Sequence, residues 1–274
     1  MRTALLLSGI SALLLLVGAL FDAVWLALAA AALLVAYALG AADRIALRAM
    51  RARPVSQAEH PRLYAIVREL ATTSRKPMPR LYVSATAAPN AFAVGRGPRS
   101  AAVCCTTGLL ELLDDRELRA VLAHEVAHVH RRDTLVASVA GALAGIIAVV
   151  GGAAALVGGD DDDDGLWGAL AVAVLGPVAA LVVRLAISRS REFRADADAV
   201  RLTGDADALV AALRKLDAGT RAAPLAPAPA LVAQAHLMVV NPFPADSALA
   251  RRFATHPPID ERVSRLRPRP APRS

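Results

Sequence analysis

His124-Glu125-Val126-Ala127-His128 lies near the middle of the chain, in a segment that the sequence predicts to be helical. On a helix, residues four apart share one face, so the imidazoles of His124 and His128 can reach one metal ion. Glu125 leans over the same site, where its carboxylate can take a proton from a water molecule at the metal. The alternative is a surface helix with two solvated histidines. The pattern favours metal-dependent hydrolysis.

The surrounding sequence predicts a mostly helical α+β domain with a small sheet. Asp114 is a candidate N-cap for the helix that carries the two histidines, and Glu117 three residues later completes a capping box. Periodicity and turn residues predict further elements on both sides of it. These are helices over Ser56–Ala71, Asp196–Ala218 and about Pro257–Arg267, strands over Arg80–Ser84, Asn90–Gly95 and Arg99–Thr106, and a loop over Ala222–Ala230.

The composition is that of a membrane protein. Of 274 residues, 56% are hydrophobic, and the mean hydropathy is +0.46, well above that of an ordinary soluble domain. The excess is concentrated in four apolar runs, each about as long as the ~20 residues that cross a bilayer. We therefore expect about four transmembrane helices in two hairpins. The runs are Leu5–Leu20, Ala23–Gly40, Leu135–Val157 and Leu166–Ile187.

Arginine carries almost all of the net charge of +7 and flanks the apolar runs. By the positive-inside rule, these flanks and the soluble segments next to them face the cytoplasm. Arginine that marks membrane topology does not indicate nucleic acid, and no nucleic-acid-binding motif accompanies it. Two alternatives remain for the runs themselves. Met1 to about Leu20 can be read as a cleaved signal peptide, and the last two runs as buried core helices or a half-inserted hairpin.

These runs divide the chain into four parts. Residues 1–42 form an N-terminal transmembrane hairpin and residues 135–187 a second one. Residues 43–134 and 188–274 together form a catalytic domain. Asp160–Asp164 lies between the last two runs and is expected to be a solvated loop rather than a weak calcium site. The adjacent Cys104 and Cys105 predict neither a disulfide framework nor a metal site.

Two histidines do not complete a catalytic zinc site, which needs a third protein ligand. The metzincin continuation is excluded, because Arg131 and Thr134 stand where it requires Gly and His. A downstream acid, His236 or His256 remains. Glu192 and Asp196 are four apart on a predicted helix, so one can bind zinc while the other accepts a hydrogen bond from a ligand imidazole. An ordinary charged helix start is the competing interpretation.

Taken together, these motifs resemble the HtpX-like integral-membrane zinc metalloproteases, which are distantly related to the CaaX prenyl proteases. The matching segments occur in the family's order and cover most of the chain. A departure is Phe193, which stands where tyrosine is common. The segments are Asn90–Gly95, Thr107–Leu110, Leu122–His128, Ser188–Asp196 and Thr255–Pro258.

The resemblance implies a gluzincin-type domain with one Zn²⁺ per chain. It assigns the zinc to His124, His128 and Glu192, and a catalytic role to Glu125. It implies that the carboxylate of Asp196 contacts one of the zinc-binding side chains and not the zinc itself. It further implies that Asn90 and His256 contact the substrate carbonyl or the oxyanion. The substrate would pair with an edge strand formed by Ala91, Phe92, Ala93, Val94 and Gly95.

The expected protein is a zinc endopeptidase of the bacterial cytoplasmic membrane. Its partners would be the lipid bilayer and misfolded or damaged proteins, chiefly membrane proteins, because main-chain pairing needs an extended segment but little sequence. A latent scaffold or chaperone on the same fold is one alternative. Others are a dedicated processing protease and a transporter component, and the latter is disfavoured because the polar residues lie outside the apolar runs.

Overall fold

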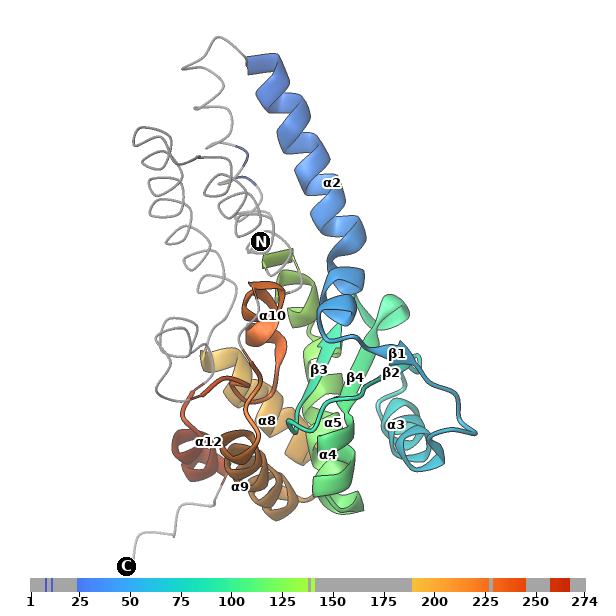
Figure 1. Ribbon diagram of the computed structural model, residues 1–274. Helices are drawn as coiled ribbons and strands as arrows, with labels where there is room; N and C mark the ends of the chain where they lie inside the picture. Colours follow the sequence, from blue (N-terminus) through green and yellow to red (C-terminus); the bar gives the residue numbers. More distant parts are fainter. Residues whose placement is uncertain are drawn as a thin grey trace, which may run out of the picture.

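The computed structural model describes residues 24–137, 139–140, 189–226, 229–244 and 257–266, together with Ser8 and Ser11. Within them, a four-stranded sheet is surrounded by helices, which confirms the mostly helical α+β prediction (Figure 1). The main helices are α2 (Val24–Ala49), α3 (Pro61–Thr73), α4 (Thr107–Leu112), α5 (Asp115–His130), α8 (Arg189–Thr203), α9 (Ala206–Ala222), α10 (Pro229–Gln234) and α12 (Ile259–Leu266).

The sheet contains β1 (Arg53–Pro54), β2 (Arg80–Ser84), β3 (Ala91–Val94) and β4 (Ala102–Thr106), in the spatial order β1-β2-β4-β3. The β2 and β4 strands are parallel, whereas β1 and β3 run antiparallel to their neighbours. In this order β3 is an edge strand of the sheet. The Ala91–Val94 part of the predicted edge strand Ala91–Gly95 therefore lies at an edge of the sheet.

The predicted strand over Arg99–Thr106 begins too early. Pro98–Ser100 forms a 3₁₀ turn, η1, and β4 starts only at Ala102. The chain enters this connection through Gly95, whose φ is +123°. A Cβ at Gly95 would lie 2.7 Å from the backbone oxygen of Ser100, so only glycine fits where the backbone turns back on itself.

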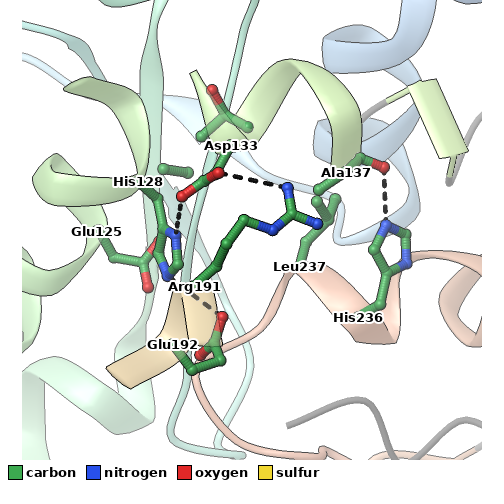
Figure 2. A pocket seen from close by; sticks show the side chains of 10 residues that line it. Glu125, His128, Asp133, Ala137, Arg191, Glu192, His236 and Leu237 are labelled. Atoms are coloured by element: carbon green, nitrogen blue, oxygen red, sulfur yellow. Dashed lines mark hydrogen bonds and ion pairs between the residues drawn. The ribbon is translucent and has the colours of Figure 1, made fainter. Parts of the chain in front are cut away.

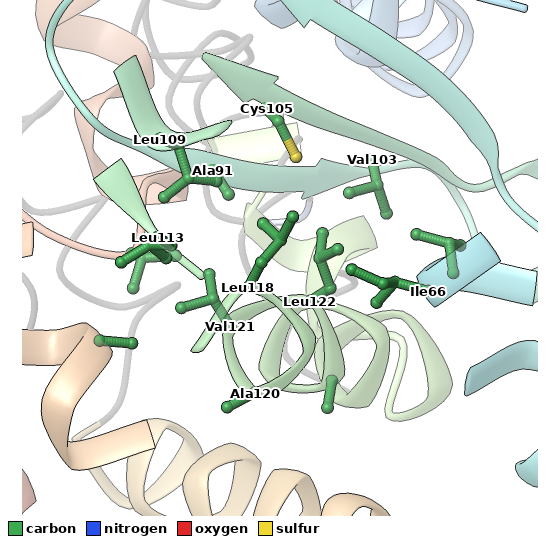
Figure 3. Close-up of a cluster of buried hydrophobic side chains, with 14 of the residues drawn as sticks. Ile66, Ala91, Val103, Cys105, Leu109, Leu113, Leu118, Ala120, Val121 and Leu122 are labelled. Carbon is green, nitrogen blue, oxygen red and sulfur yellow. The ribbon is translucent and has the colours of Figure 1, made fainter. Parts of the chain in front are cut away.

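The two faces of the sheet are covered by different helices. Val103 and Cys105 point into a core cluster with Leu118 and Leu122 of α5 (Figure 3). Cys104, the neighbour between them, lies in the cluster on the other face, which includes the end of α2. The alternation of side chains along β4 thus places a core on each face of the sheet.

Helix α5 is the central element. The predicted capping box is confirmed, because the Asp114 side chain accepts from the Glu117 backbone N–H and the Glu117 side chain accepts from that of Asp114. Most of its residues are buried, as it packs against α3, α8, α9 and β3. The histidine pentapeptide therefore lies on a rigid, deeply embedded helix.

The expected helix over Asp196–Ala218 is in fact two helices. The first, α8, ends at Thr203, and Gly204 then adopts a left-handed φ of +73°. Asp205 caps the next helix by accepting a hydrogen bond from the Ala208 backbone. Glycine followed by an N-cap aspartate is a combined stop and start signal. The two carboxylates of interest, Glu192 and Asp196, both lie on α8.

Other helices differ from expectation only at their ends. Helix α3 begins at Pro61 rather than Ser56, because proline takes the first helical position readily. The final helix α12 covers Ile259–Leu266, which confirms the prediction from the Pro257-Pro258 pair. In the expected Ala222–Ala230 loop, residues 223–226 are non-helical and α10 starts at Pro229.

Among the described residues, no helix combines the length and the hydrophobicity needed to cross a bilayer. The expected apolar run Leu166–Ile187 and, except for Ser8 and Ser11, the run Leu5–Leu20 lie outside the described residues. So does most of Leu135–Val157. The run Ala23–Gly40 corresponds to the first part of α2.

Candidate metal centre

Three side chains from two helices converge on one point. His124 and His128 lie on the same face of α5, and their Nε2 atoms are 3.0 Å apart. Glu192 of α8 approaches both, with one carboxylate oxygen 3.7 Å from Nε2 of His124 and the other 3.5 Å from Nε2 of His128. Two ligands about 2.1 Å from a tetrahedral ion lie about 3.4 Å apart, so these spacings fit a divalent metal. The three residues form a group that could hold a metal ion.

The first imidazole is oriented by a buried ion pair. Nδ1 of His124 lies 2.9 Å from a carboxylate oxygen of Asp196, four residues after Glu192 on α8. Arg262 of α12 donates to both oxygens of Asp196, at 2.6 and 2.9 Å, and is fully buried. Asp196 therefore directs Nε2 of His124 toward Glu192, and the cation of Arg262 keeps that carboxylate charged.

The second imidazole has a carboxylate behind it too. Nδ1 of His128 lies 3.4 Å from Asp133, which follows the end of α5. The second oxygen of Asp133 lies 3.3 Å from the guanidinium of Arg191, the residue before Glu192 (Figure 2). Burial raises the pKa of Asp133, but the hydrogen bonds and positive charges of His128 and Arg191 together outweigh burial, so that the pKa is lowered overall.

The pKa values of the two candidate ligand imidazoles are shifted in opposite directions. Burial lowers the pKa of His124 to about 4, despite the hydrogen bond to Asp196. Burial would also lower the pKa of His128, but the charges of Glu192 and Asp133 raise it to about 9. The two Nε2 atoms are within hydrogen-bond distance of each other, at 3.0 Å. Because metals bind neutral imidazole, a metal at this site requires both Nε2 atoms to be unprotonated.

Glu125 lies beside this group in the position expected for a proton acceptor. Its side chain is buried, and this burial raises its pKa to about 7. The backbone N–H of Ala93 on β3 donates a hydrogen bond to its carboxylate. A carboxyl group with a pKa near neutrality can both take up and return a proton at pH 7.

A pocket lies beside the candidate metal ligands His128 and Glu192 (Figure 2). It brings together groups from α5, the helical residues 133–137 that follow it, α8, β3 and the 3₁₀ turn η2 (Ala235–Leu237). The pocket is lined by Ala93, Glu125, His128, Asp133, Thr134, Ala137, Arg191, Glu192, His236 and Leu237. The edge strand and the metal ligands thus share one cavity.

The outer edge of β3 is already partly occupied. Val239 donates its backbone N–H to the carbonyl of Ala91, at 3.1 Å. Further along the edge, the N–H of Ala93 meets Glu125, and the carbonyl of Gly95 accepts from the Thr134 hydroxyl at 2.9 Å. All four residues of β3 are buried. An incoming peptide that pairs with Ala91 therefore has to displace the Val239 segment.

Asn90 lies directly before β3, and its side chain forms hydrogen bonds with backbone groups. Its amide nitrogen donates to the carbonyl of Val240 at 2.9 Å, and its amide oxygen accepts from the backbone of Ala91. Asn90 is 1% exposed and does not line the pocket. In this arrangement it fixes the Val239–Val240 segment to β3 rather than facing the metal ligands.

The other sequence candidates are placed differently. His256 lies outside the described residues, so its expected contact with the substrate stays a prediction. His236 lines the pocket, and its Nε2 lies 2.8 Å from the carbonyl of Ala137. It does not belong to the metal-binding group. Asp196 is where the helical spacing from Glu192 predicted it.

Sequence reasoning missed Asp133, Arg191 and Arg262. Arg191 lies within the segment that carries Glu192, and Arg262 lies four residues beyond Pro258, so both were close to recognised motifs. Asp133 follows the histidine helix directly. A rule that a buried ligand histidine needs an acceptor for its second nitrogen would have directed attention to these acidic and basic neighbours.

Comparison with known proteins agrees with this geometry. The family model described as Peptidase family M48 matches residues 57–269. A protein of Kineococcus radiotolerans named "Protease HtpX homolog" is 50% identical over 282 residues, which cover 97% of this chain and 95% of that relative. Proteins with the same name from Paenarthrobacter aurescens and Ralstonia pickettii are 47% and 39% identical. Each covers 97% of this chain and 94% of the relative.

Proposed function

The chain belongs to peptidase family M48 and is a metalloprotease, and we propose that its metal is zinc and that it cleaves unfolded protein segments at the cytoplasmic face of a membrane. The observation that carries this proposal is the convergence of His124, His128 and Glu192 beside the buried Glu125. Two imidazoles and a carboxylate are a common ligand set of catalytic zinc, which leaves a fourth position open.

When bound, zinc supplies a Lewis acid that activates water and polarises a carbonyl. The chain's own residues do the rest. Glu125 accepts the proton of the attacking water and returns it to the leaving amine, for which a pKa of about 7 is well matched. His124 and His128 stay in place because their Nδ1 atoms contact Asp196 and Asp133. His256 is proposed to donate to the developing oxyanion.

The substrate is proposed to bind as an extended strand next to β3. Ala93 borders the pocket, so a peptide beside it would have its backbone close to Glu125. Pairing through main-chain groups selects for a segment that is already unfolded and asks little of its side chains. This supports misfolded or damaged proteins as substrates, including those of the membrane.

A membrane location is supported by the sequence and by α2. The apolar runs are long enough to span a bilayer. On the first part of α2, the large hydrophobic side chains of Leu33 and Tyr37 are 71% and 54% exposed. On the second part, Arg44 and Arg48 are exposed and lie beside the catalytic domain. Arginines at this end support a catalytic domain on the cytoplasmic side.

The first test compares wild type with Glu125→Gln and, as a matched control, Glu111→Gln, an exposed residue on α4. Each protein is purified in detergent, and zinc content and casein cleavage are measured. We expect one zinc per chain in all three, and cleavage by wild type and Glu111→Gln alone. Cleavage by Glu125→Gln would refute the role of Glu125. Zinc without cleavage in wild type would favour a scaffold, and absence of zinc would refute the metal site.

A further inference from the structure

Asp133 is not part of the zinc-ligand pattern, yet it lies directly behind one of the ligands. One carboxylate oxygen is 3.4 Å from Nδ1 of His128, and the other is 3.3 Å from the guanidinium of Arg191. The side chains of Asp133 and His128 are each 15% exposed, and that of Arg191 is 11% exposed. The contact therefore lies largely away from solvent, on the wall of the pocket.

The backbone has to leave the helix to make this contact. Five residues along an α-helix correspond to 500°, so on a continued helix Asp133 would point about 140° away from His128. Helix α5 instead ends at His130, and Arg132 adopts a left-handed φ of 57°. A non-glycine residue rarely takes this conformation unless its surroundings hold it there. The turn directs Asp133 back to His128.

Contacts on both sides hold this turn. Before it, Arg131 forms an ion pair with Asp198 of α8. After it, the hydroxyl of Thr134 donates to the carbonyl of Gly95 at 2.9 Å, and Thr134 is buried. The turn is therefore attached to α8 on one side and to the end of β3 on the other. This makes Asp133 a fixed feature of the pocket.

The same arrangement occurs at the other ligand. His124 contacts Asp196 through Nδ1, and Asp196 is held by Arg262. Each zinc-binding imidazole thus has a carboxylate behind it, and each carboxylate has an arginine. The Asp196 contact is shorter, at 2.9 Å against 3.4 Å for Asp133.

We propose that Asp133 is a positioning residue for the metal site, which holds His128 with Nε2 toward Glu192 and is itself held by Arg191. A carboxylate that accepts the second N–H of a ligand histidine fixes its tautomer and its ring orientation and increases its basicity. Loss of such a partner commonly lowers metal affinity 10- to 100-fold. This inference rests on the proposed zinc site and adds a residue to it.

The test measures zinc affinity by competition with a chromogenic chelator, on full-length protein in detergent. The variants are Asp133→Ala, Asp133→Asn and, as a control, Asp115→Ala, whose side chain lies at the other end of α5 and is 78% exposed. We expect Asp133→Ala to bind zinc about 10- to 100-fold more weakly. Asp133→Asn keeps an acceptor for the imidazole N–H and should lose less. Asp115→Ala should bind as wild type does.

A second readout separates positioning from folding. The visible spectrum of bound Co²⁺ reports ligand geometry, and it should change in Asp133→Ala but not in Asp115→Ala. If folded Asp133→Ala keeps the zinc affinity and the Co²⁺ spectrum of wild type, the proposal is wrong, even if the variant is less stable. If wild type itself binds no zinc, the proposed function fails instead.

Discussion

Replacement of Arg262 by methionine tests how the metal site is built into the core. Arg262 is fully buried and donates to both oxygens of Asp196 and to the carbonyl of Val239, at 2.9, 2.6 and 3.2 Å. Methionine fills much of the same space but leaves the Asp196 carboxylate, 3% exposed, without a cation. Removing one partner of a buried ion pair typically costs about 3–5 kcal/mol. We expect a loss of this size in the free energy of unfolding.

The measurement is urea unfolding in detergent at pH 7, followed by far-UV circular dichroism, with chelator present so that metal binding does not contribute. The Asp196→Asn variant and the double variant complete a cycle. The double variant contains no uncompensated charge. Its loss in the free energy of unfolding should therefore be smaller than the sum of the two single losses by about 2 kcal/mol or more. Additive losses, or a loss below about 1 kcal/mol for Arg262→Met, would refute the reasoning.

Three further predictions follow from the described geometry. Alanine at Gly108 would place its Cβ 1.9 Å from the backbone oxygen of Ala87, so Gly108→Ala should lower the free energy of unfolding by roughly 3 kcal/mol. Burial raises the pKa of Cys104 to about 12 and that of Cys105 well above its ordinary value. Iodoacetamide at pH 8 should therefore leave both unmodified in folded protein and label both in urea, as mass spectrometry can show. Burial also raises the pKa of Glu125 from 4.5 to about 7, so metal-free wild type should lose stability as pH rises through this window. In thermal unfolding of metal-free protein, the stability of Glu125→Gln relative to wild type should increase between pH 5 and pH 8. A difference in stability that does not change with pH would contradict this.

Local signals made much of the fold predictable. The capping box of Asp114 and Glu117 set the start of α5, and the β2 strand has the predicted bounds, Arg80–Ser84. The errors occurred where local signals competed. The Asp196–Ala218 pattern remains apolar and periodic across Gly204, yet the left-handed glycine and the capping Asp205 end one helix and begin another. Periodicity reports which residues face the core, but not whether the backbone between them is continuous.

Spacing on a helix made each pair of candidate site residues predictable, whereas the choice of Glu192 as third metal ligand came from the family resemblance. His124 and His128 are four apart, as are Glu192 and Asp196, and each pair shares a helical face. Their partners are not set by spacing. Arg262 reaches His124 across 138 positions in the chain, and Asp133 reaches His128 only because Arg132 leaves the helical conformation.

The edge strand β3 is a second case in which the sequence predicted an element but not the contacts that it makes. The family resemblance implied that Ala91–Gly95 would pair with a substrate as an edge strand, and β3 does lie at the edge of the sheet. Yet Val239 donates to Ala91, and Arg262 binds the carbonyl of the same Val239. The segment on the strand edge is therefore tied to the arginine that holds Asp196 behind His124. If the substrate pairs at Ala91 as proposed, this segment has to move. The proposed substrate site and the support of the candidate ligand His124 would then both depend on the buried guanidinium of Arg262.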